Sequence, residues 1–561
     1  MAAPNPQLEV AIRRFGAQAG VTPAQEAQLR SAVMADVDRL QLLNAQATAG
    51  QLRGFALEAT AATLIGTYDK RGGVTSLPAA SFTSTGVAAS AELRAVVGIQ
   101  AISIQFAHRS WQDAAGQRQA VSQNMVENLQ AAFNGSPVLA TQLKEAVLQA
   151  HVEHFGLLDG SMTAGATYDG STLDGTPKGI NLPPLALQTK TAANSRGKYD
   201  PRDMTFVLGH EIQHGFNDAA KDAATHRFLR DIAIQASTRT TVHDYSDELR
   251  GYLGVGREDE AKAQIAGWNA LLSRERQAAP DLGGLVLMLN TQSDRVLDFI
   301  QPDQGNPSGA VIKPGLTFNP DGSLSPTPAN IAAMGQHYFA RPSPLYAHPG
   351  ERPVALGAGR SGPSANYTNY YGTWAVEQII AAEDRANVSH RGARPQIAID
   401  MAGLGLKEDL IEMEGLDLGA DRRPRPYLDT SRTPAVPGHF HHTQDASMGH
   451  DHQHVPVIAS ERIRPSGDPL VDAWIDALQD GDDAAARAVQ HVLAKSAEGQ
   501  RLWSGATTGA LDPEAGHRHA FEASPDKATR PSTDYATDHA HPIFNDPRPH
   551  RLAELQHEME R

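Results

Sequence analysis

The segment TFVLGHEIQHGFN, residues 205–217, restricts the fold more than any other part of this chain. It places His210, Glu211 and His214 in the order H-E-x-x-H. Residues four apart lie on one face of a helix, about one turn from each other. On a helix, both imidazoles would therefore point to one spot, which suits two ligands of a tetrahedral Zn²⁺ ion. Glu211 would lie close enough to take a proton from a zinc-bound water. We expect His210 and His214 to bind the metal and Glu211 to act as the catalytic base.

The residues around this segment favour a buried helix. Asp200 reads as the helix N-cap, Pro201 as the first helical residue and Asp203 as an acid in the first turn. A buried face precedes the first histidine, formed by Met204, Val207 and Leu208. Gly209 and Gly215 would let other backbone approach closely, and Gly215 with Asn217 also reads as the end of the helix.

A second helix is predicted from residue 257 onward. An apolar stripe at helical spacing indicates that it packs against another element: Ala261, Ile265, Trp268 and Leu272. Acidic residues directly precede this stripe, among them Glu258 and Glu260. A carboxylate from a second helix is one way to supply a third zinc ligand.

Together the two segments resemble the zincin metallopeptidases, and among them the gluzincins, which take their third ligand from a glutamate on a second helix. Metzincins require a glycine and a histidine where this chain has Asn217 and Ala220, and no Gly-Thr-x-x-Asp run of the aspzincins follows. Residues 259–261, Asp-Glu-Ala, match the start of the gluzincin pattern Asn-Glu-Ala-x-x-Asp, but Gln264 stands where that pattern ends in Asp.

The resemblance implies a zincin-like core, an endopeptidase activity and Glu260 as the third Zn²⁺ ligand. The Gln264 departure leaves the support of a histidine by a carboxylate open. The gap from His214 to Glu260 is longer than is typical of thermolysin-like enzymes. Other residues therefore remain candidates for the third ligand: Glu258, Glu248 and His243.

Two further features of the predicted catalytic region bear on substrate. Residues 166–169 and 179–182 read as two strands around the turn 173–175, and a strand edge can pair with an extended peptide. An aromatic cluster at 366–374 contains Tyr370 and Tyr371, either of which could donate a hydrogen bond to a developing oxyanion, although packing is the simpler role. An apolar helix is expected to follow through Val376 and Ile379.

Composition excludes several other classes of protein. The chain of 561 residues carries a net charge of −15, which argues against nucleic acid or an anionic membrane as a partner. No apolar run approaches the length of a transmembrane helix, so no membrane span is expected. There is no cysteine, which removes disulfides and thiol chemistry. The start, MAAPNPQLEVAIRRF, lacks a signal-peptide layout, so we expect synthesis in the cytoplasm without one.

Composition and periodicity divide the chain into five regions of an α+β, mainly helical protein. Residues 1–160 read as a helical region, with a capping box at Thr22–Gln25, an apolar stripe from Leu29 through Val37 to Leu43, and further helical patterns at 89–106, 118–133 and 139–157. His151 and His154 read as ordinary helix residues. The other predicted regions are a metallopeptidase domain with a small sheet at 161–430, a His- and Pro-rich linker at 431–466, a small helical module at 467–510 and a disordered tail at 511–561.

The linker is dense in histidine, at positions 439, 441, 442, 450, 452 and 454. A second metal site is open there, but the spacing is irregular, and a flexible histidine-rich linker is the preferred interpretation.

The order of regions resembles certain bacterial toxin-like effectors that are exported without a signal peptide. That resemblance implies delivery into a target cell, a secretion-machinery or immunity protein as partner, and a protein or cell-wall peptide as substrate. The alternative is a non-catalytic interaction or adhesion protein in which a closed zinc site, with a fourth protein ligand such as His243, clamps two helices.

Overall fold

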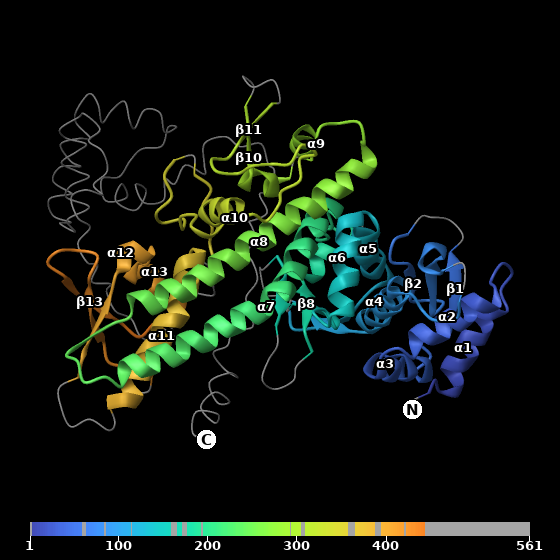
Figure 1. The fold of residues 1–561 in the computed structure, drawn as a ribbon, viewed down its shortest axis with the longest axis horizontal. Helices are drawn as coiled ribbons and strands as arrows, with labels where there is room; N and C mark the ends of the chain where they lie inside the picture. The colour runs from blue at the N-terminus through green and yellow to red at the C-terminus, as the bar shows by residue number, and fades with distance from the viewer. Residues whose placement is uncertain are drawn as a thin grey trace. The chain divides into compact units, whose positions relative to one another are not determined.

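Two long helices, α7 (Pro201–Ala236) and α8 (Ser246–Ala278), run side by side through the middle of the described chain (Figure 1). They are antiparallel, because Arg202 at the start of α7 pairs with Glu275 near the end of α8 at 2.9 Å, whereas Phe228 stacks on Tyr252 at the opposite ends. The N-cap predicted at Asp200 is confirmed, since its side chain accepts from the backbone of Arg202 and Asp203. The apolar stripe of the second helix is buried as predicted.

This computed structural model describes residues 3–443 with gaps at 59–62, 84–85, 114, 159–164, 171–176, 192–193, 292, 304–308, 350, 357–364, 388–393 and 420–421. The predicted helical module at 467–510, the tail at 511–561 and the histidines at 450, 452 and 454 lie outside the described residues. The described part is a mixed α+β structure, about 52% helical with small sheets, which confirms the predicted α+β class. No helix in this part is long and apolar enough to cross a membrane.

Glycines set the close approach of α7 and α8. A Cβ added to Gly209 would lie 2.8 Å from the Cβ of Ala270, and one added to Gly267 would lie 2.9 Å from the backbone oxygen of Phe206. Gly215 was expected to end the motif helix together with Asn217, and that expectation is wrong, because α7 continues to Ala236. Gly215 instead gives room to the ring of Tyr168, which a Cβ would meet at 3.1 Å.

Filling the helix contact should therefore destabilise the protein. Gly267→Ala is expected to lower the free energy of unfolding by about 1–3 kcal/mol, since the backbone of α7 cannot move aside without opening the core. Gly251→Ala is the matched control on the same helix, because it is exposed and its Cβ would meet nothing within 4 Å. It should be neutral or stabilising by up to about 1 kcal/mol. Urea unfolding of both variants tests this, and equal effects would refute the packing argument.

The region before the motif combines helices with short strands. Its helices are α1 (Pro6–Gly16), α2 (Pro23–Val33), α3 (Val37–Thr48), α4 (Ala91–Ala107), α5 (Gln123–Asn134) and α6 (Pro137–Leu148). Its strands are β1 (Gly54–Glu58), β2 (Thr67–Asp69), β3 (Val74–Pro78), β4 (Ser110–Gln112) and β5 (Arg118–Ala120), with the 3₁₀ turn η1 (Ala79–Ser81). The strands form one sheet in the order β1-β3-β2 and a β4-β5 hairpin. The strand content was not predicted.

Two sequence predictions in this region need correction. The apolar stripe from Leu29 to Leu43 is not one helix, because α2 ends at Val33 and Asp36 caps a new helix, leaving Val37 58% exposed. The helix predicted over 139–157 ends at Leu148. Ala150 adopts a left-handed conformation with φ 55°, which ends the helix, and His154 then begins the strand β6 (His154–Leu157). His154 is therefore a strand residue, not a helix residue.

The two predicted strands before the motif are confirmed as β7 (Thr167–Asp169) and β8 (Gly179–Leu182), which pair antiparallel. The sheet order is β6-β8-β7, so β7 is at an edge. The 3₁₀ turn η2 (Pro184–Leu187) leads toward α7. Tyr168 of β7 contacts Gly215 of α7, which places this edge strand against the motif helix. The predicted turn at 173–175 lies outside the described residues.

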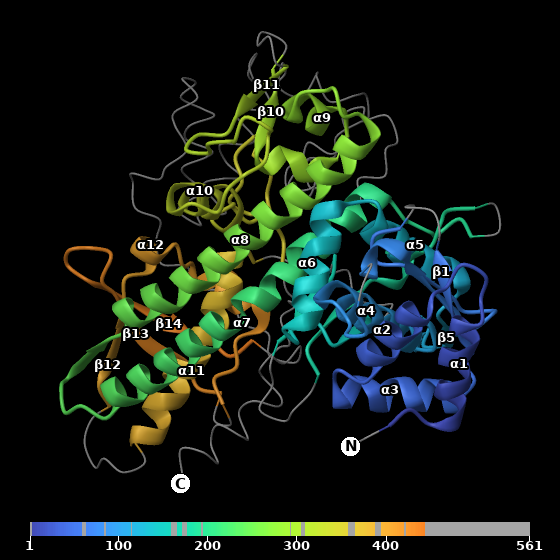
Figure 2. The same ribbon diagram turned by 45° about the vertical axis from the view of Figure 1, so that its right-hand side comes forward.

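The part after α8 wraps the other side of the helix pair (Figure 2). Its helical elements are α9 (Gly284–Asn290), η3 (Asp294–Asp298), α10 (Pro328–Met334), the π-helical turn η4 (Gly335–Phe339), α11 (Tyr367–Asn387), α12 (Met401–Leu404) and α13 (Glu408–Gly415). Its strands are β10 (Ile300–Pro302), β11 (Ala310–Ile312), β12 (Gln396–Ile399), β13 (Arg425–Asp429) and β14 (Val436–Phe440), and β12 also pairs with β9 (Val242–Asp244), which lies between α7 and α8 in the chain. β10 pairs with β11, and the other four form the sheet β14-β13-β12-β9.

Two core clusters meet along α7 and α8. One cluster runs from Leu8 to Ile212 and includes Ala270. The N-terminal helices therefore share a core with the motif helix, although the sequence suggested a domain boundary at residue 160. The other runs from Phe206 to Phe440. Residues 436–440 belong to the sheet through β14, where the sequence suggested a linker from 431, because they pair with β13 over five residues. The chain divides into two compact units, and all described residues belong to the same one.

Candidate metal centre

Three predicted ligands meet between α7 and α8. His210 and His214 of α7 and Glu260 of α8 form a group that could hold a metal ion, and all three are buried. The two histidine Nε2 atoms are 3.0 Å apart, and His210 Nε2 is 3.5 Å from Glu260 Oε2. Ligand atoms of a tetrahedral site with bonds of about 2.1 Å lie about 3.4 Å from one another. The spacing of these donors therefore fits such a site.

Hydrogen bonds on the far side of each imidazole fix which nitrogen faces the site. His214 Nδ1 lies 2.9 Å from Asp259 Oδ1. A carboxylate only accepts, so Nδ1 carries the proton and Nε2 offers a lone pair. Asn217 Nδ2 also donates to Asp259 Oδ1 at 2.8 Å, and Lys221 lies 2.8 Å from its other oxygen. Asn217 was expected to end the helix, but it steadies Asp259 instead.

Gln264 supports the other histidine in a similar way. Its Nε2 donates to Asp298 Oδ2 at 3.0 Å, and its Oε1 lies 3.2 Å from His210 Nδ1. Because Asp298 is an acceptor, the amide group must face it, which leaves the amide oxygen for the proton on His210 Nδ1. Arg341 contacts Asp298 at 3.1 Å and holds its charge in place. The residue that departs from the gluzincin pattern thus still orients a histidine.

The two fixed tautomers leave a pair of lone pairs facing each other. With both Nδ1 atoms protonated, the Nε2 atoms of His210 and His214 face each other at 3.0 Å, where they either share a proton or direct both lone pairs at a cation between them. The donor set of two imidazoles and a carboxylate also matches the ligands that Zn²⁺ takes. The residues present fit a metal ion.

Removing the Gln264 bridge should weaken metal binding without unfolding the protein. Gln264→Ala is expected to raise the Kd for Zn²⁺ about 10–100-fold, because His210 loses its orienting acceptor. Gln277→Ala is the control, since Gln277 is an exposed glutamine on the same helix. Competition with a chromophoric chelator gives both Kd values, and thermal unfolding checks the fold. An unchanged Kd in Gln264→Ala would show that the contact does not orient the ligand.

Glu211 lies beside the ligands and has a distinct environment. It is fully buried, and neither carboxylate oxygen has a hydrogen-bond partner within the described residues. Burial raises the pKa of this carboxyl to about 8. A buried carboxyl whose oxygens accept no hydrogen bond, next to a candidate metal centre, has the environment expected of a proton acceptor. A cation beside it would favour its ionised form.

Tyrosines from two other elements complete the surroundings. Tyr371 of α11 donates from its hydroxyl to Glu260 Oε1 at 3.2 Å. The ring of Tyr338, in the π-helical turn η4, is 6.2 Å from that of His210, and its hydroxyl is 2.6 Å from that of Tyr367. Burial raises the pKa of Tyr371 well above its usual value, so its hydroxyl stays protonated. Of the two predicted tyrosines, Tyr371 is the one that contacts a candidate ligand; Tyr370 packs edge-on against it.

The alternative third ligands point elsewhere. Glu258 is 51% exposed and pairs with Lys262 at 2.6 Å, one helical turn along. Glu248 lies in the first turn of α8. His243 is buried on β9, with Nδ1 2.5 Å from Glu383 and Nε2 3.0 Å from Thr238. Among the described residues, the metal-ligand group around the motif histidines contains Glu260 alone as its acid.

Sequence reasoning missed three supports of this centre. Asp298 ends the 3₁₀ turn η3, which follows α9, and no pattern marked it. Asp259 was noted as part of a motif, without its contact to His214. Tyr338 lies in the π-helical turn η4, and no pattern marked it. The available signal was the pair of adjacent acids Asp259 and Glu260. On a helix, adjacent side chains point in different directions, so one carboxylate can contact His214 while the other contacts His210.

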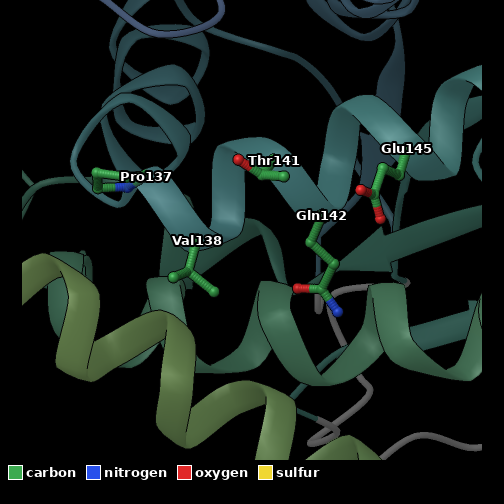
Figure 3. Close-up of a pocket in the computed structure, with 5 residues that line it drawn as sticks. All are labelled: Pro137, Val138, Thr141, Gln142 and Glu145. Atoms are coloured by element: carbon green, nitrogen blue, oxygen red, sulfur yellow. The ribbon is translucent and has the colours of Figure 1, made fainter. Parts of the chain in front are cut away.

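Two hollows of the described structure are lined by residues other than the candidate ligands. One, of about 390 Å³, lies along α6 and is lined by Pro137, Val138, Thr141, Gln142 and Glu145 (Figure 3). Gln142 from its lining donates to the backbone oxygen of Gly209, immediately before the first histidine. The other, of about 250 Å³, lies between α11 and the sheet.

The fold and the site define a mixed α+β protein with a buried His-His-Glu candidate metal centre. No family model matched the chain, and neither the curated proteins nor the solved structures contained a match.

Proposed function

We propose that this protein is a zinc-dependent peptide-bond hydrolase with a zincin-like, gluzincin-type centre. The observation that carries the proposal is the convergence of His210, His214 and Glu260 next to the unpartnered carboxylate of Glu211. Zn²⁺ held by the three ligands would supply a Lewis acid and a water of lowered pKa at its remaining position.

The protein's own groups divide the remaining work. Glu211 accepts the proton of the attacking water and returns it to the leaving amine. Asp259 and Gln264 hold the two imidazoles in the tautomer that keeps Nε2 toward the metal. Tyr371 keeps its proton, and its bond to Glu260 fixes that carboxylate. From this place it could also turn its hydroxyl toward an oxyanion, as proposed for Tyr370 or Tyr371 from the sequence.

A peptide is the substrate class that the surroundings support. β7 is an edge strand against the motif helix, next to Gly215 and therefore just past His214. An edge strand offers backbone donors and acceptors to an extended chain. We propose that the substrate is a protein. If this chain is a secreted effector or toxin, we propose a cell-wall peptide as the substrate instead.

One observation favours the non-catalytic alternative. His210, Glu211, His214 and Glu260 are each no more than 1% exposed, and a metal that only fastens α7 to α8 would be buried in this way. Against a closed site stands the engagement of His243, the proposed fourth ligand, with Glu383 and Thr238. Structural zinc sites almost always have four protein ligands, and the described group supplies three.

Purified full-length protein decides between the two. It is incubated with a mixture of denatured proteins and, separately, with peptidoglycan, in three states: as prepared, treated with a metal chelator, and restored with one equivalent of ZnCl₂. New fragments in the first and third states, and none in the second, support the hydrolase. Cleavage that survives complete metal removal refutes it. Zinc that wild type binds and His210→Ala loses, with no cleavage of either substrate by wild type, supports the structural clamp.

A further inference from the structure

A second group of metal-binding side chains lies away from the motif helices. Glu408 and Glu412 occupy successive turns of α13, and His441 directly follows β14. One ligand atom from each comes within 4.8 Å of the other two. His441 Nδ1 is 3.0 Å from Glu412 Oε1, and the backbone N–H of His441 donates to the same oxygen at 2.6 Å. The group is thus built from two elements that are 29 residues apart in sequence.

The charges of this group are unbalanced on one side. Glu408 and Glu412 are four residues apart on a helix, a spacing at which like charges repel. Glu412 is buried at 1% exposure, which strengthens that repulsion. Glu408 accepts a hydrogen bond from the hydroxyl of Tyr427 at 2.8 Å, but no lysine or arginine side chain within the described residues pairs with it. A divalent cation would offset both carboxylates at once.

The histidine comes from a stretch that the sequence had already marked. His441 is one of six histidines between positions 439 and 454, and a second metal site was an open interpretation of that density. Among the described histidines of this run, His439 is exposed on β14, whereas His441 lies against Glu412 of α13. One imidazole and two carboxylates form a donor set that Zn²⁺ and similar divalent ions accept.

We propose that Glu408, Glu412 and His441 bind a second divalent transition-metal ion, with Zn²⁺ as the probe, which fastens the β13–β14 hairpin to α13. The hairpin forms the end of the four-stranded sheet, so the bound ion would join it to a helix, and with three protein ligands a water would complete the coordination. The competing explanation is a simple ion pair between His441 and Glu412 that needs no metal. The proposal does not depend on the proposed hydrolase activity.

Zinc stoichiometry of the full-length chain tests the site. After saturation with ZnCl₂ and exhaustive dialysis, elemental analysis should find two equivalents in wild type and one in each of His441→Ala and Glu408→Gln. His439→Ala is the matched control, an exposed histidine two residues away, and should keep two. His210→Ala should keep one, and the His210→Ala/His441→Ala double variant none.

A stability measurement separates this site from the first. In the His210→Ala background, chelator should lower Tm, and adding His441→Ala should abolish that shift. One equivalent in wild type that His441→Ala and Glu408→Gln retain, two equivalents in both of these variants, or an equal loss in His439→Ala would overturn the second site. One equivalent in wild type that His210→Ala keeps and His441→Ala loses would instead refute the motif centre while the second site stands. Glu408→Gln preserves side-chain volume, so a folded variant is available even if His441→Ala unfolds.

Discussion

Glu211→Gln should bind zinc with wild-type stoichiometry and lose about 10²–10⁴-fold in kcat/KM for peptide hydrolysis. Glutamine keeps the shape of the side chain but cannot accept a proton from water at neutral pH. The ligands His210, His214 and Glu260 are untouched, so the metal should stay. Steady-state kinetics on a cleaved peptide and elemental analysis of the same sample give the two readouts.

The environment of Glu211 makes this the sharpest test of chemistry. Its oxygens have no hydrogen-bond partner in the described structure, so the substitution breaks no bond that holds the fold. Asp231→Asn is a suitable control, because it removes an acid from the same helix at a partly exposed position where Asp231 pairs only with its neighbour Arg230. A Glu211→Gln variant as active as wild type would remove Glu211 from the mechanism. Loss of zinc along with activity would instead assign Glu211 to metal binding.

Local patterns predicted the parts of the centre that lie on one helix. The spacing of His210 and His214 and the cap at Asp200 require only helical geometry, and both are found on α7. The stripe through Trp268 likewise predicted the buried face of α8. The prediction of the helix end from local sequence was wrong. A glycine near an asparagine is a common signal for a helix end, but here Gly215 lies inside α7 and accommodates Tyr168. The packing need of a distant strand outweighed the local signal.

Contacts between distant segments lay beyond any local pattern. Asp298 reaches His210 only through Gln264, and Tyr338 reaches it from a π-helical turn within a segment rich in proline and glycine. Neither residue belongs to a sequence pattern with helical or strand periodicity, so periodicity could not predict its position at the centre. The support of a histidine by a carboxylate, which the sequence left open, comes to His210 through the neutral amide of Gln264 backed by Asp298, so the negative charge lies one residue further from His210 than a direct Asp would place it.

Glu260→Gln should lose metal, and Glu258→Gln should not. Glu260 is fully buried and lies 3.5 Å from His210 Nε2, whereas Glu258, two residues earlier on the same helix, is 51% exposed beside Lys262. An amide is a far weaker zinc ligand than a carboxylate, so Kd for Zn²⁺ should rise by roughly a hundredfold or more, beyond the effect of losing an orienting contact. Activity should fall with it at limiting zinc.

The pair of variants compares two acids of the same type on one helix, so differences in net charge cancel. Chelator competition gives Kd for each, and circular dichroism verifies that both remain folded. Metal loss in Glu258→Gln with retention in Glu260→Gln would move the third ligand to the exposed face and contradict the observed geometry. Retention in both would leave only two protein ligands, too few for a stable zinc centre, and the metallopeptidase proposal would fall with the Glu260 assignment.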